Sequence, residues 1–91
     1  MTPNLETAFM YGAAIDDNPR LADILRTQGF KRTRHAPDRL WHKGPRHGRR
    51  FVAFLNPAGD TLTVARPGRD QFTELDVNSP TLETGIHTFT H

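Results

Sequence analysis

The sequence predicts one α+β domain over residues 1–91, a small two-layer domain with one well-capped helix packed on an antiparallel sheet of about four strands. Two observations support this fold class. A capped amphipathic pattern covers residues 18–28, and two alternating apolar runs around a tight turn cover residues 50–66. Six Phe, one Trp and one Tyr in 91 residues supply the large apolar side chains that a disordered chain lacks.

The helix is predicted from both of its ends. Asp17 or Asn18 can cap the N-terminus, and Pro19 suits the first helical position because no backbone donor is missed there. Gly29 suits the left-handed residue that ends a helix, and Phe30 can then fold back onto it. Between these ends the helical period is followed by Leu21, Ile24, Leu25 and the polar Gln28.

Strands separated by turn signals are expected after the helix. Their expected positions are residues 30–35, 39–43, 50–56 and 61–66. The last two form a hairpin, because Pro57 presets the torsion of the turn and Gly59 allows a positive φ. In residues 39–43 Trp41 alternates with Leu40 and His42, so the buried side of that strand stays open. Breaks are expected at residues 36–38 and 44–48.

The two ends of the chain give weaker patterns. Residues 4–11 fit either a short helix capped by Thr2 or an apolar strand, and residues 71–77 have no clean period. Ser79 and Pro80 suit a single helical turn, followed by a closing strand over residues 86–89.

Charge is distributed unevenly along the chain. Residues 31–50, called the basic segment below, hold six Arg and two Lys against one Asp, whereas the whole chain has a net charge of only +2. Arginine can donate two parallel hydrogen bonds to a phosphate, and neutralised phosphates release counterions. The chain therefore suits a small non-enzymatic nucleic-acid-binding module, for DNA or RNA. Its expected contact residues are Lys31, Arg32, Arg34, Arg39, Trp41, Lys43, Arg46, His47, Arg49 and Arg50.

Two further interpretations of this segment stay open. Trp41 fits a core residue better than a platform for an unpaired base. The cations also fit a solvated face or an acidic protein partner, as in a compact phage- or plasmid-type inhibitor or adaptor that blocks defence machinery. An exposed edge strand would further allow a homodimer.

Several kinds of chemistry find no support in the sequence. With no cysteine, disulfides, thiolate metal sites and a Cys nucleophile are excluded. His35, His42 and His47 have no metal-ligand spacing, and Ser79 precedes a proline, so we expect no metal, no cofactor and no catalytic residue. No apolar run approaches the ~20 residues of a membrane span, and residues 1–4 do not begin a signal peptide, so a cytoplasmic protein is expected.

The order of elements from Leu21 to about Arg69 resembles the HicA-type toxins, which cleave RNA and have a fold like that of double-stranded-RNA-binding domains. The shared features are a helix that ends at Gly29-Phe30, a basic strand, and a hairpin over Pro57-Ala58-Gly59. The resemblance implies a Gly-Ser-His element with a catalytic histidine. The corresponding loop, residues 44–48, has no serine, and His47 is its candidate for a general acid or base.

Overall fold

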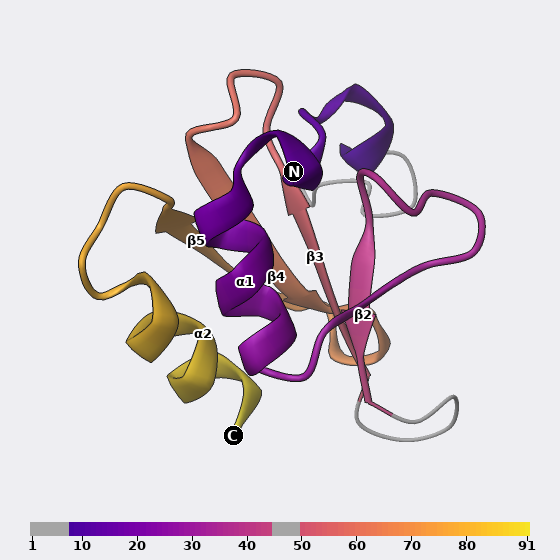
Figure 1. Ribbon diagram of the computed structural model, residues 1–91. Coiled ribbons are helices and arrows are strands. Elements are labelled where there is room, and N and C mark those ends of the chain that lie inside the picture. The colour runs from indigo at the N-terminus through magenta and orange to yellow at the C-terminus, as the bar shows by residue number, and fades with distance from the viewer. Residues whose placement is uncertain (1–7, 45–49) are drawn as a thin grey trace.

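A computed structural model describes residues 8–44 and 50–91 of the chain. Two α-helices and a five-stranded antiparallel sheet make an α+β domain (Figure 1). In chain order the elements are η1 (Ala8–Tyr11), η2 (Ile15–Asp17), α1 (Pro19–Thr27), β1 (Lys31–Arg32), β2 (Trp41–Lys43), β3 (Phe51–Leu55), β4 (Thr61–Arg66), η3 (Pro67–Arg69), β5 (Gln71–Asp76) and α2 (Leu82–Thr90).

Helix α1 begins and ends as the sequence predicts. The Asn18 side chain accepts a hydrogen bond from the Leu21 N–H at 3.2 Å, which satisfies one free donor of the first turn. Gly29 has a φ of 92°, and the Phe30 N–H reaches back to the Leu25 carbonyl at 2.9 Å. This pattern is the Schellman motif, and it places Phe30 in the core with 2% of its surface exposed.

The sheet is a meander in which consecutive strands are neighbours, in the order β1-β2-β3-β4-β5. The β3–β4 hairpin is confirmed, with Ala53 opposite Val64 and a φ of 76° at Gly59. The expected strand over residues 30–35 shortens to β1, with only Lys31 and Arg32 paired. The expectation of about four strands is corrected to five, because residues 71–76 pair along the whole length of β4.

The closing strand expected over residues 86–89 is wrong, because this segment lies in helix α2. Threonine has low helix propensity, but burial on one face of the helix outweighs it. Leu82 and Ile86 are buried one turn apart, and the Phe89 ring meets Phe51 of β3 edge-on at 5.9 Å. Within the described residues, no helix has the length and apolar character needed to cross a bilayer.

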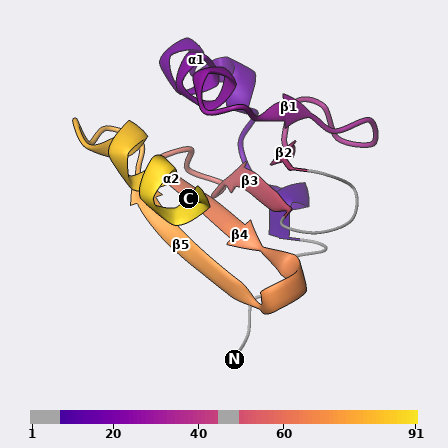
Figure 2. The same cartoon turned by 90° about the horizontal axis from the view of Figure 1, so that it is seen from below.

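The sheet has two faces with different cover. Both α-helices pack on one of them, called the helix-covered face below, where Trp41, Phe51 and Val64 join the main core. The other, called the opposite face, has a smaller apolar cluster that includes Val52 and Phe54. Figure 2 shows η1 on this opposite side of the sheet, away from α1.

Candidate functional site

Strand alternation distributes the basic segment over both faces of the sheet. Residues paired directly across strands point to the same side, so Lys31 and His42 share the opposite face with Val52. Arg32 pairs with Trp41, and both therefore belong to the helix-covered face, as does Lys43. The cations that are contiguous in sequence thus form two groups in space.

On the helix-covered side, Arg32 takes part in an intramolecular ion pair. Its guanidinium donates to both carboxylate oxygens of Asp16, and the Nη2–Oδ1 distance is 2.6 Å. These hydrogen bonds from Arg32 hold the pKa of the Asp16 carboxyl below its ordinary value of 3.8. A phosphate would have to compete with Asp16, so Arg32 is a poor contact residue.

Trp41 is a core residue, as the favoured interpretation predicted, and its place among the expected contact residues is corrected. Only 1% of its surface is exposed. The guanidinium carbons of Arg26 and Arg32 lie 5.5 and 5.0 Å from its ring centroid, a distance at which cation–π attraction is felt. An unpaired base cannot reach this ring unless the core opens.

The remaining cations of the basic segment are in different situations. Arg39 donates to the Met10 carbonyl at 2.8 Å from an exposed position, which leaves most of its side chain accessible. Lys43 is half-buried on the helix-covered face. Arg46, His47 and Arg49 lie outside the described residues, so their predicted contacts, and the acid–base role expected for His47, stay predictions.

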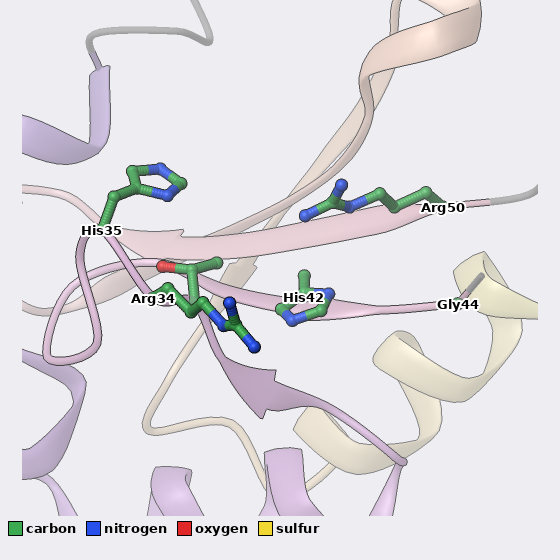
Figure 3. A pocket seen from close by; sticks show the side chains of 6 residues that line it. Arg34, His35, His42, Gly44 and Arg50 are labelled. Atoms are coloured by element: carbon green, nitrogen blue, oxygen red, sulfur yellow. The ribbon is translucent and has the colours of Figure 1, made fainter. Parts of the chain in front are cut away.

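A basic pocket opens where the loop after β1 meets β2 and the start of β3. It has a volume of about 440 Å³. The described residues that line it are Thr33, Arg34, His35, His42, Gly44 and Arg50. In Figure 3 the guanidinium groups of Arg34 and Arg50 lie on two sides of the His42 ring. No carboxylate occurs among these lining residues.

Two nitrogen atoms of the pocket residues are shielded from solvent and have no hydrogen-bond partner among the described residues. They are His42 Nδ1 and Arg50 Nε, and outside the pocket the Trp41 indole nitrogen shares this condition. Burial of the His42 ring lowers the pKa of its imidazole below 6.5, and the nearby charges of Arg50 and Lys31 lower it further. The burial of the ring and the two nearby positive charges disfavour a further positive charge on His42, and they favour an anion in the pocket.

Thr33 lines the pocket, and the hydrogen bonds of its hydroxyl are internal. It donates to the Leu40 carbonyl at 2.9 Å and accepts from the Ala36 N–H at 3.3 Å. These bonds hold the loop after β1 against β2, and so they position Arg34 and His35 at the pocket.

The described residues were also compared with the needs of a metal site. Among the described residues, no group of three or more His, Asp or Glu side chains could hold a metal ion. The pocket presents hydrogen-bond donors and positive charge, which are the groups that suit an anion.

His35 and His42 were not among the expected contact residues, because their spacing in the sequence fits no metal site and alone indicates no other ligand. The available signal was alternation: His42 and Arg50 lie on one face when β2 and β3 pair in the register that places His42 opposite Val52. The register that brings Lys31 beside His42 needs the observed pairing.

Comparison with known proteins gives no match to a protein-family model, to a curated protein or to a solved structure.

Proposed function

We propose that this protein is a small nucleic-acid-binding module whose basic pocket and neighbouring cations contact phosphates. The observation that supports it most is the composition of the pocket. Two arginines and two histidines converge there, without a carboxylate among the described lining residues. Lys31 adds a third fixed positive charge, since it pairs with His42 on the same face. Arg39 lies close by, lining a shallow hollow that it shares with His35.

Phosphate is the anion that these groups fit best. A guanidinium is planar and always charged, and it donates two parallel hydrogen bonds to phosphate oxygens. An ordinary solvated face spreads its cations over convex surface, whereas Arg34 and Arg50 line one concave site. The shielded Arg50 Nε still needs an acceptor within the described structure, and a phosphate oxygen would supply one.

A second candidate function is docking on a protein, as a compact inhibitor or adaptor. It is favoured by two exposed apolar side chains, because 54% of the Met10 surface and 75% of the Tyr11 surface are accessible. The hydrogen bond from Arg39 to the Met10 carbonyl places a cation beside them. Tyrosine and arginine are common anchors of protein interfaces. Binding to naked nucleic acid separates the two candidates.

Fluorescence anisotropy tests the leading proposal with labelled single-stranded DNA, duplex DNA and duplex RNA at two salt concentrations. The informative variant is Arg34→Gln, because Arg34 is exposed at the pocket and its loss leaves the core intact. Arg26→Gln is the matched control, since it removes the same charge from an exposed position on α1. We expect salt-dependent binding that Arg34→Gln weakens several-fold and Arg26→Gln leaves nearly unchanged. Absence of binding at low salt would reject the proposal in favour of a protein partner.

A further inference from the structure

We infer that the basic pocket binds a terminal phosphate, the phosphomonoester at the end of a nucleic-acid strand, in preference to a phosphodiester within it. This inference rests on the proposed nucleic-acid function and specifies which part of the ligand enters the pocket.

The size of the site suits a phosphate with one attached sugar. The pocket is bounded by three consecutive pieces of the fold: the loop that holds Arg34, the strand that holds His42, and the residue before β3, Arg50. Its volume of about 440 Å³ lies within the range of pockets that hold a small ligand, so a phosphate and its attached sugar can enter. An internal phosphodiester must leave such a site along two directions of the strand, and a terminal one along a single direction.

The charge of the site exceeds what one phosphodiester needs. Arg34 and Arg50 are permanently charged, and Lys31 lies next to His42 in the sheet register. A phosphodiester has one negative charge and two free oxygens. A phosphomonoester has about −1.5 to −2 at pH 7 and three acceptor oxygens. The monoester therefore balances more of this positive charge than a diester does, and its three oxygens can accept from Arg34, His42 and Arg50.

The donors left for this ligand are specific atoms. Arg50 Nε is a shielded donor without a partner among the described residues, and His42 Nδ1 is likewise unpartnered and donates once the imidazole is protonated. Figure 3 shows the Arg34 guanidinium reaching the same space from the loop after β1. Thr33 is excluded as a donor because its hydroxyl already bonds the Leu40 carbonyl. Arg34, His42 and Arg50 thus approach the phosphate from three separate segments.

The test compares strand ends at constant charge. A 5′-phosphorylated 8-mer, a 3′-phosphorylated 8-mer and an unphosphorylated 10-mer of the same composition have nearly equal total charge. Each competes with a labelled strand for the wild-type protein, and a nucleoside 5′-monophosphate forms a fourth arm. One phosphorylated 8-mer should bind about ten-fold or more tighter than the 10-mer, because charge-assisted hydrogen bonds at the end are added.

The variants locate this preference in the pocket. Arg50→Gln and Arg34→Gln should each remove most of the preference for the phosphorylated end, whereas Arg26→Gln should keep it. Arg34 is exposed, so its replacement tests the inference even if the half-buried Arg50 proves necessary for folding.

The opposite outcomes have distinct meanings. Equal binding of the 8-mers and the 10-mer would overturn the terminal-phosphate inference and leave nucleic-acid binding in place. No binding of any strand would reject the proposed function itself. A mononucleotide that competes as well as the phosphorylated strand would show that the ligand is a free nucleotide, which also overturns the inference.

Discussion

Trp41 belongs to the basic segment in sequence, but its side chain is buried in the core. Its ring is 1% exposed, and Arg26 and Arg32 cover it at 5.5 and 5.0 Å. The ring pairs across the strands with Ala53, in the centre of the main core. Trp41 therefore stabilises the sheet under α1, and the phosphate contacts that we propose involve other residues of the basic segment.

Replacement of Trp41 tests this assignment. We expect Trp41→Ala to lower the free energy of unfolding by about 3–5 kcal/mol, because a large core side chain is removed. Urea unfolding followed by circular dichroism measures the loss. A variant that keeps its stability and loses nucleic-acid affinity would instead show that the ring contacts the ligand.

His42 should make binding depend on pH. Its pKa lies below 6.5 in the folded protein, because of burial and then the charges of Arg50 and Lys31. A bound phosphate favours the imidazolium and raises this pKa, so binding takes up a proton. Affinity should therefore rise as the pH falls from 8 towards 5.5, by up to about ten-fold for each unit by which the ligand raises the pKa.

The measurement uses a strand without terminal phosphate, since its phosphodiesters do not titrate in this range. His42→Gln should flatten the pH dependence, and His87→Gln on α2 is the matched control. An unchanged profile of affinity against pH in His42→Gln would place the titrating group elsewhere.

The stability of the protein without ligand should change with pH in the opposite direction from the affinity. Because the pKa of His42 is lowered in the folded protein, the folded state loses stability as the pH falls from 6.5 towards that lower pKa.

Helix α2 depends on close contact between the helix and strand β5. A β-carbon on Gly85 would lie 2.9 Å from Leu75 Cδ2, closer than real β-carbons approach. Gly85→Leu should therefore destabilise the fold by about 1–3 kcal/mol through overpacking. Thr84→Leu, exposed on the same helix, is the control and should be nearly neutral. Equal thermal stability of the two variants would contradict the observed docking of α2.

At the scale of elements, the sequence supports prediction wherever local chemistry decides the structure. The ends of α1 follow from Asn18 and Gly29, and the β3–β4 turn follows from the residues at its corner. Helix α2 could not be predicted this way, because its threonines favour strands and only tertiary burial of Leu82 and Ile86 makes it helical. The missing information was packing against β3 and β5.

At the scale of the whole molecule, the sheet sorts a basic segment into a structural group and an accessible group. Arg32 is paired with Asp16, while Lys31, Arg34, Arg39 and Arg50 lie in or near the pocket region. The basic composition predicted positive charge on the surface, whereas the pocket required the observed register of β1, β2 and β3. The positive charge of the site could therefore be predicted from the sequence, whereas the pocket that gathers this charge could not.

The number of accessible cations predicts the salt dependence. Four phosphate contacts, one from each of Lys31, Arg34, Arg39 and Arg50, give a slope of log affinity against log salt of about −3 to −4. Arg34→Gln should reduce the slope by about one, and Arg26→Gln should not change it. Anisotropy titrations at four salt concentrations measure both slopes. A wild-type slope near zero would contradict binding through phosphates.

The most direct test of the central claim is an amide NMR titration of the protein with a short 5′-phosphorylated oligonucleotide. We expect the largest shifts in the described residues at 31–35, 42–44 and 50, in and beside the pocket. The exposed surfaces of α1 and α2 should change little, because they lie on the other side of the sheet. Shifts concentrated on those helices, or no shifts at low salt, would contradict the claim that the pocket on the opposite face binds nucleic acid.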